Sequence, residues 1–242
     1  MKRVLITGAS SGIGLQLARD YVADGWTVVA CGRHHHKLKQ AMSGERVEYA
    51  VFDINDRTAA TDALNAVAPV DLAILNAGTC EYVDDAHAFD AALFERVVQA
   101  NLIGTANCVA AVLPRIKTGG RLALVSSSVT FVPLTRAEAY GASKAGVDYL
   151  ARTLAVDLKP DQVAVSLIRP GFVDTPLTQK NDFPMPGRVS PAQASRAIRS
   201  GLAKGKREVT FPAGFIATLS LLSWLPQGLW LSLARRMKKE QA

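Results

Sequence analysis

Cysteine is scarce in this sequence, and its placement argues against two kinds of site. The three cysteines among 242 residues, Cys31, Cys80 and Cys108, are odd in number and widely spaced. They form neither a CxxC pair nor a cysteine–histidine pattern typical of zinc. Three consecutive histidines at 34–36 do not compensate, since adjacent side chains point in different directions. We therefore expect reduced, packed thiols and no metal site.

The chain also lacks internal repeats, low-complexity tracts and a linker rich in proline or serine. Hydrophobic residues make up 49% and charged residues 20%, which is too apolar a balance for intrinsic disorder. A chain of this length can bury a large core as a single α/β domain. We expect one domain over residues 1–242, in which residues 213–242 form an apolar and basic C-terminal extension.

No hydrophobic leader precedes the first strand-like run, because the segment 1–3 passes directly into Val4-Leu5-Ile6. The cytoplasm is therefore the expected compartment. The net charge is +7, with basic clusters at 33–39, 199–207 and 235–239. Only the last cluster has aromatic residues nearby, whereas a nucleic-acid surface typically interleaves the two kinds. We expect no nucleic-acid partner.

Short β-rich runs alternate with segments of helical periodicity along the chain. The runs lie at 4–7, 27–31, 47–52, 72–75, 121–125, 163–168 and 208–211, and the clearest helical segments at 13–23, 59–67, 93–113 and 142–158. This order predicts a Rossmann-type, doubly wound α/β fold, in which a seven-stranded parallel sheet carries helices on both faces. Ligands bind at the carboxyl ends of such strands.

A glycine-rich loop follows the first strand and leads into a helix. Glycine permits dihedral angles closed to other residues, and it lets a pyrophosphate approach the amides at a helix N-terminus, where the dipole favours anions. Its position between a strand and a helix favours a dinucleotide site. The expected contacts are Gly8, Ser10, Ser11, Gly12, Ile13 and Gly14.

Six motifs in order resemble the short-chain dehydrogenase/reductase family. They are the GxxxGxG loop, Asn76-Ala77-Gly78, Asn101, a serine near residue 127, Tyr140-Gly141-Ala142-Ser143-Lys144 and Pro170-Gly171. The resemblance covers residues 2–212 and implies hydride transfer between a nicotinamide cofactor and a small carbonyl or alcohol substrate. It also implies a homodimer or homotetramer, since the helices equivalent to 93–113 and 142–158 pair subunits in the family.

The end of the second strand bears on which nicotinamide cofactor is used. A carboxylate there accepts a hydrogen bond from a ribose 2′-hydroxyl and repels a 2′-phosphate. By alignment, Gly32 stands where NAD-dependent members of the family hold aspartate, and Arg33 offers a fork suited to phosphate oxygens. We therefore expect NADP(H), while a solvated loop role for Arg33 stays open.

The resemblance supplies further cofactor contacts. Asp53, followed by Ile54, is expected at the adenine amino group, and Asn76, Ala77 and Gly78 beside the adenosine ribose. Pro170, Gly171, Val173 and Thr175 are expected to frame the nicotinamide, the last two at its carboxamide. Simple turn roles stay open for Asp53 and for the 76–78 segment.

Tyr140 and Lys144 are four residues apart in a helical segment, so they share a face about 6 Å apart along the axis. A phenol has a reference pKa of ~10, and lowering it by ~3 units takes ~4 kcal/mol. One ammonium at ~5 Å in an effective dielectric of ~20 gives ~3 kcal/mol, and the positive charge of an oxidised nicotinamide nearby can supply the remainder. We expect Tyr140 to be the general acid/base and Lys144 to lower its pKa.

Two further catalytic groups are expected beside this pair. A serine hydroxyl after the fifth strand can stabilise the substrate oxygen as its charge changes. Ser127 lies thirteen residues before Tyr140, the spacing associated with the family serine, with Ser128 as the alternative and Ser126 as structural. The family counterpart of Asn101 holds a water linked to the lysine, whereas a helix-capping role is the other interpretation.

Residues 175–189 are rich in proline and glycine and predict a lid over the substrate. The candidate pocket walls are apolar: Phe131, Val132, Leu134, Phe172, Leu177 and Phe183. The uncharged run 215–233 is interrupted at Pro226-Gln227-Gly228 and followed by a basic cluster. A lid helix, a dimer contact, a peripheral membrane anchor and a transmembrane span all stay open for it.

The predicted function is NADP(H)-dependent interconversion of an apolar aldehyde or ketone and its alcohol. The alternative is a non-catalytic NADP-binding regulatory protein of the same fold, because fold alone does not establish activity. Ser127, Tyr140 and Lys144 argue against that alternative. An epimerase or dehydratase on the same scaffold is disfavoured, because the chain has no room for a nucleotide-sugar domain.

Overall fold

The computed structural model describes the backbone of residues 1–239 and the side chains of residues 1–234. Its strands form one seven-stranded parallel sheet in the order β3-β2-β1-β4-β5-β6-β7. They are β1 (Arg3–Thr7), β2 (Thr27–Gly32), β3 (Val47–Val51), β4 (Val70–Leu75), β5 (Ile116–Val125), β6 (Ala164–Pro170) and β7 (Glu208–Phe211). The predicted Rossmann-type sheet is confirmed. The strand order reverses between β1 and β4, which is where such sheets bind ligands.

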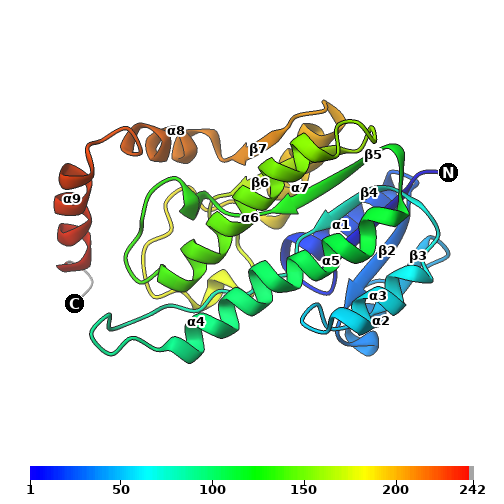
Figure 1. Cartoon of the computed structure of the whole chain (residues 1–242), viewed down its shortest axis with the longest axis horizontal. Coiled ribbons are helices and arrows are strands. Elements are labelled where there is room, and N and C mark those ends of the chain that lie inside the picture. The colour runs from blue at the N-terminus through cyan, green and yellow to red at the C-terminus, as the bar shows by residue number, and fades with distance from the viewer. Residues whose placement is uncertain (240–242) are drawn as a thin grey trace.

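Helices cover both faces of the sheet (Figure 1). They are α1 (Gly12–Ala23), α2 (His35–Ala41), α3 (Arg57–Asn65), α4 (Ala91–Val98), α5 (Gly104–Val112), α6 (Glu138–Asp157), α7 (Pro191–Ala203), α8 (Ala213–Leu222) and α9 (Gln227–Lys239). Buried residues of α3, α5 and α6 share one core cluster with the sheet, and those of α1, α2 and α7 share the other. The central strands are therefore covered on both sides, whereas the edge strands β3 and β7 keep exposed positions.

Central strands such as β1 and β2 read as nearly continuous hydrophobic runs because both of their faces are buried. Leu5 faces the cluster under α3, α5 and α6, whereas its neighbours Val4 and Ile6 face the cluster under α1 and α7. All three side chains are fully buried. Side chains of β1 therefore pack against helices on both faces of the sheet. The loop that follows β1 lies at the switch point of the strand order.

The predicted helix at 93–113 is interrupted. A π-helical turn, Gln99–Ile103, separates α4 from α5. The combined stretch Ala91–Arg115 is long and apolar enough to span a membrane by length and composition alone. It packs instead against α3 and α6, and its residues share the sheet's core cluster. We assign it to the core of the fold.

The C-terminal extension continues from β7 as α8 and α9, which lie at one end of the molecule, far from β3 (Figure 1). Residues 223–226 join the two helices, and α9 begins directly after Pro226, where the sequence predicted an interruption. Residues 240–242, the end of the predicted extension, lie outside the described residues.

Candidate active site

The glycine loop between β1 and α1 forms a cradle that side chains would fill. Gly8 and Gly12 have positive φ angles of 71° and 55°. A Cβ on Gly14 would lie 2.3 Å from the Gly8 carbonyl oxygen and 2.6 Å from Asn76 Nδ2. Ser11 caps α1 without a side-chain hydrogen bond, and the first turn holds no acidic residue. This arrangement fits an anionic pyrophosphate at the N-terminus of α1.

A cleft of about 550 Å³ extends from this cradle along the ends of β2, β3 and β4. Its lining includes most of the predicted cofactor residues, namely Gly8, Ser10, Ser11, Gly12, Ile13, Arg33, Asp53, Ile54, Asn76, Ala77, Gly78 and Thr175. Backbone amides of Asn76 and Ala77 donate to the Thr7 hydroxyl at 2.9 and 3.0 Å. These bonds join the ends of β1 and β4 and position the 76–78 segment.

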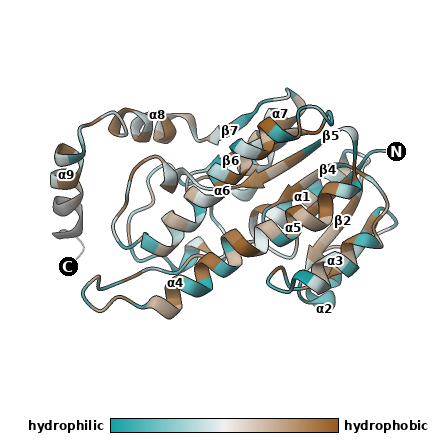
Figure 2. Cartoon of the chain, viewed as in Figure 1, coloured by the Kyte–Doolittle hydropathy of each residue, from teal (hydrophilic) through white to brown (hydrophobic). Residues whose placement is uncertain are grey.

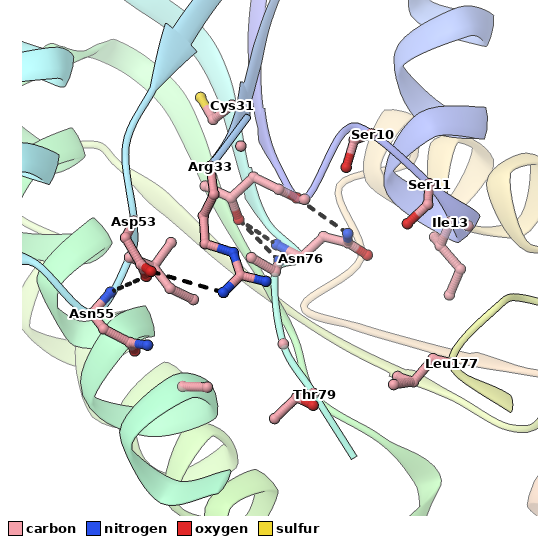
Figure 3. Close-up of a pocket in the computed structure, with 18 of the residues that line it drawn as sticks. Ser10, Ser11, Ile13, Cys31, Arg33, Asp53, Asn55, Asn76, Thr79 and Leu177 are labelled. Carbon is pink, nitrogen blue, oxygen red and sulfur yellow. Dashed lines mark hydrogen bonds and ion pairs between the residues drawn. The ribbon is translucent and has the colours of Figure 1, made fainter. Parts of the chain in front are cut away.

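Arg33 and Asp53 face each other across the cleft (Figure 3). The guanidinium Nη1 lies 3.8 Å from Asp53 Oδ2, with the two side chains 65% and 41% exposed. Asp53 Oδ1 also accepts a hydrogen bond from the Asn55 amide at 2.9 Å, as in a turn. An exposed ion pair at this distance stabilises little, so the Arg33 guanidinium remains accessible to an anion.

The remaining predicted cofactor residues lie next to the cleft rather than in its lining. Pro170 ends β6, Gly171 lines the neighbouring cavity, and Val173 pairs with Val189 in a parallel bridge. Thr175, which does line the cleft, follows them, and its hydroxyl lies 3.3 Å from the hydroxyl of Thr178. The segment after β6 is thus held in place at the border of the two spaces.

Tyr140 and Lys144 lie one turn apart on α6, as predicted. Lys144 is buried, and its Nζ donates to the Val125 carbonyl at 3.0 Å and lies 5.8 Å from the centroid of the Tyr140 ring. Burial lowers the pKa of Lys144 to about 8, although nearby Cys80 and Asp148 raise it. The lysine therefore remains largely cationic at neutral pH.

The expectation that Lys144 lowers the pKa of Tyr140 is wrong for this geometry. Burial of the phenol dominates and raises the pKa of Tyr140 well above its usual value, while a hydrogen bond with Ser127 lowers it. The Lys144 ammonium is engaged with the Val125 carbonyl. A phenol in this environment is neutral and suited to donate a proton.

Each of the three serines after β5 has a different environment. Ser127 is half-buried, lines a cavity together with Tyr140, and accepts a hydrogen bond from the Val129 amide at 3.2 Å. Ser128 lines the same cavity but is buried. Ser126 donates to the Lys144 carbonyl at 3.1 Å, which fits the structural role expected for it.

Asn101 lies in the π-helical turn and is fully buried. Its Oδ1 accepts from the Thr79 amide at 2.7 Å, and its Nδ2 donates to the Thr79 carbonyl at 2.9 Å and to the Ser143 hydroxyl at 3.0 Å. A Cβ on Gly78 would lie 2.8 Å from Asn101 Oδ1 and 3.4 Å from Lys144 Nζ. Asn101 therefore joins the cleft to the α6 residues, and π-turns often occur at such sites.

An apolar cavity of about 560 Å³ adjoins the cleft, and Leu177 lines both spaces. Of the predicted walls, Leu134, Phe172, Leu177 and Phe183 line it. Phe131 and Val132 do not, because they pack against the C-terminal helices. The walls that sequence reasoning missed are Cys80, Tyr82, Arg136, Phe215, Leu219, Leu222, Trp230, Leu233 and Ala234. The C-terminal extension therefore forms part of the cavity wall.

Arg136 ties two loops together over this cavity. Its Nη2 lies 2.6 Å from Asp84 Oδ1, and its Nη1 lies 2.8 Å from Asp182 Oδ1 on the predicted lid. The guanidinium also lies over the Tyr82 ring, 5.5 Å from its centroid, and that ring packs edge-on against Phe183. Sequence separation hides this clamp, since its residues are distant along the chain.

Known proteins resemble this chain along most of its length. A family model for short chain dehydrogenases matches residues 2–184. The chain is 32% identical to an uncharacterized oxidoreductase of Myxococcus xanthus, covering 98% of each, and 30% identical to 3-dehydrosphinganine reductase TSC10B of Arabidopsis thaliana, covering 98% of this chain and 78% of that one. A short chain dehydrogenase of Burkholderia cenocepacia, solved with NADP, superposes with a TM-score of 0.85 at 25% identity, covering 96% of this chain and 99% of that one.

Proposed function

Because the chain belongs to the short-chain dehydrogenase family, we propose that it is an oxidoreductase that uses NADP(H) to interconvert an apolar carbonyl compound and its alcohol. One observation carries this proposal. Ser127 and Tyr140 line the apolar cavity. Lys144, on the same helix as Tyr140, lies next to Gly78, and Gly78 lines the cleft formed by the glycine loop.

The protein's own groups have distinct roles in this reaction. When bound, the nicotinamide supplies or accepts the hydride. Tyr140, a neutral phenol in the cavity lining, donates the proton to the carbonyl oxygen, and Ser127 hydrogen-bonds the same oxygen as its negative charge grows. Lys144 places a positive charge one helical turn away and anchors α6 to the end of β5. A neutral phenol provides the proton that the reduction of a carbonyl requires.

NADP(H) is favoured over NAD(H) by the end of β2. Gly32 contributes no carboxylate there, and the exposed guanidinium of Arg33 reaches into the cleft. Asp53 faces that guanidinium, and a bound 2′-phosphate would compete with the Asp53 carboxylate for it. Structures resembling this chain include complexes with NADP and with NADPH.

A homodimer through α4, α5 and α6 accompanies this proposal. On α6, Tyr149 and Val156 are 77% and 71% exposed, and Ala142 and Ala145 continue the same exposed stripe. Exposed apolar side chains at helical spacing are typical of a contact surface. Light scattering of Tyr149→Glu beside the unaltered protein tests this contact. If the contact is correct, the variant should dissociate and show a lower molar mass in solution than the unaltered protein.

The activity is tested by following NADPH consumption with a panel of aldehydes, ketones, acyl-chain ketones and quinones, each repeated with NADH. We expect turnover of apolar carbonyl compounds and a lower KM for NADPH than for NADH. Saturable NADPH binding without turnover of any compound in the panel would instead support a non-catalytic NADP-binding regulatory protein.

A further inference from the structure

The C-terminal helices α8 and α9 are apolar on the side that faces the protein. Leu219, Trp230 and Ala234 are buried in a cluster with Val132. The indole Nε1 of Trp230 donates to the Pro133 carbonyl at 2.9 Å, which fixes α9 against the loop that follows β5. This inner side also lines the apolar cavity, so the position of the two helices is set by the body of the protein.

Large apolar side chains around the junction of these helices face solvent, and we call this surface the outer hairpin face. It comprises Leu221, Trp224, Leu225, Leu229 and Leu231, which are 74%, 89%, 37%, 60% and 46% exposed. Figure 2 shows α8 largely in the colour of hydrophobic residues. Large apolar side chains exposed this close together in the chain are typical of an interaction site.

The charge near this face identifies the kind of partner. Residues 213–239 contain no aspartate or glutamate, and they end with Arg235, Arg236, Lys238 and Lys239. The side chains of these four lie outside the described residues, but all four belong to α9. A second copy docked about a two-fold axis would bring the same positive charges together, whereas an anionic lipid surface would neutralise them.

The lengths of α8 and α9 determine whether these helices would cross a lipid bilayer or lie on its surface. α8 has 10 residues and α9 has 13, whereas a span needs about 20 apolar residues. A tryptophan as exposed as Trp224, followed by basic residues, is typical of helices that lie in the interface between water and lipid.

We propose that the outer hairpin face docks on an anionic membrane surface, with its leucines and Trp224 in the interface and the basic end of α9 at the lipid headgroups. The inner side of the same helices continues to line the cavity. Docking therefore brings the wall of the apolar cavity against the lipid surface without any part of the chain crossing the bilayer. The surface itself does not depend on the proposed reaction.

Vesicle co-sedimentation of the full chain tests the proposal, with phosphatidylcholine vesicles that contain or lack phosphatidylserine, at low and high salt. We expect binding to the anionic vesicles at low salt that weakens as salt rises. The variant Leu221→Ser/Trp224→Ser should bind at least about tenfold more weakly. The matched control Leu221→Met/Trp224→Phe, which keeps the face apolar, should bind like the unaltered chain.

The electrostatic part has its own pair of variants. Replacing Arg235, Arg236, Lys238 and Lys239 by glutamine should weaken binding to anionic vesicles at least about tenfold. A control that removes the same charge elsewhere, from the exposed Lys37, Lys159, Lys204 and Lys206, should have little effect.

Two results would overturn the proposal. The first is that the same fraction of protein sediments with vesicles that contain and that lack phosphatidylserine, or that the serine variant sediments with anionic vesicles as well as its apolar control does. The second is an oligomer in solution that dissociates in Leu221→Ser/Trp224→Ser while the unaltered chain ignores vesicles, since a second copy would then cover the face. Light scattering without lipid identifies that outcome.

Discussion

The ammonium of Lys144 lies 5.8 Å from the centroid of the Tyr140 ring, one turn further along α6. Burial affects the two groups in opposite directions, because it disfavours the charged form of each. It raises the pKa of the phenol and lowers that of the amine to about 8. At neutral pH the pair is therefore a proton donor beside a cation, which is the arrangement needed to reduce a carbonyl.

The Lys144 charge predicts how reduction depends on pH. The pKa of Lys144 is about 8, so its positive charge is lost as the pH rises through this value. We expect kcat for carbonyl reduction to fall on the alkaline side of pH 8. In Lys144→Met, kcat should be low at every pH and should not show this fall on the alkaline side of pH 8. A pH–rate profile of the two proteins measures it, and an identical alkaline limb in both would exclude Lys144 as its source.

Stability should change with pH in the opposite sense. The folded-state pKa of Lys144 is about 8 and the ordinary value is 10.5, so between these values the unfolded chain binds more protons. The free energy of unfolding should then rise with pH across this window, by about 3 kcal/mol at most for this group. Denaturant titrations should show this rise in the unaltered protein relative to Lys144→Met. A constant difference between the two would contradict the shifted pKa.

Arg33 is expected to select the cofactor. Arg33→Ala should raise KM for NADPH by roughly tenfold to a hundredfold, because a charge-assisted phosphate contact contributes ~1.5–3 kcal/mol. KM for NADH should change little. The exposed Arg57, which lies outside the cleft lining, provides the control Arg57→Ala. Equal KM values for both cofactors in the unaltered protein would refute the assignment.

The Arg136 clamp predicts a positioning effect on substrate binding. Arg136→Met removes the ion pairs to Asp84 and Asp182 while keeping an apolar side chain beside Tyr82. We expect KM for the carbonyl substrate to rise several-fold with a smaller change in kcat, and limited proteolysis of residues 178–188 to become faster. Arg57→Met, at an exposed arginine outside both the cleft and the cavity, is the control. Unchanged proteolysis would show that the clamp does not hold the lid.

Much of the fold could be predicted because its signals are local. Seven apolar runs separated by helical periodicity predicted the sheet, and the glycine loop marked the first turn at the switch point. The spacing of Tyr140 and Lys144 placed them on one helix face. These features depend on residues that are close in sequence.

Features that depend on distant contacts could not be predicted. The π-turn at Asn101 is held by Thr79, 22 residues away, and Arg136 reaches Asp182 across 46 residues. The apolar pattern of the C-terminal extension was clear, but its docking against the cavity depends on Trp230 meeting Pro133 across 97 residues. The pKa of Tyr140 was misjudged for a related reason, since pairwise charge arithmetic omitted the burial that the whole fold imposes.

In the proposed reaction, Tyr140 protonates a carbonyl as NADPH reduces it. The most direct test uses NADPH deuterated at the transferable position of its nicotinamide ring and an apolar ketone that is turned over. The unaltered protein should place the deuterium on the carbinol carbon of the product. Tyr140→Phe should bind NADPH equally well but lose at least about 100-fold in kcat. A near-normal rate in that variant, or a product without deuterium, would contradict the account.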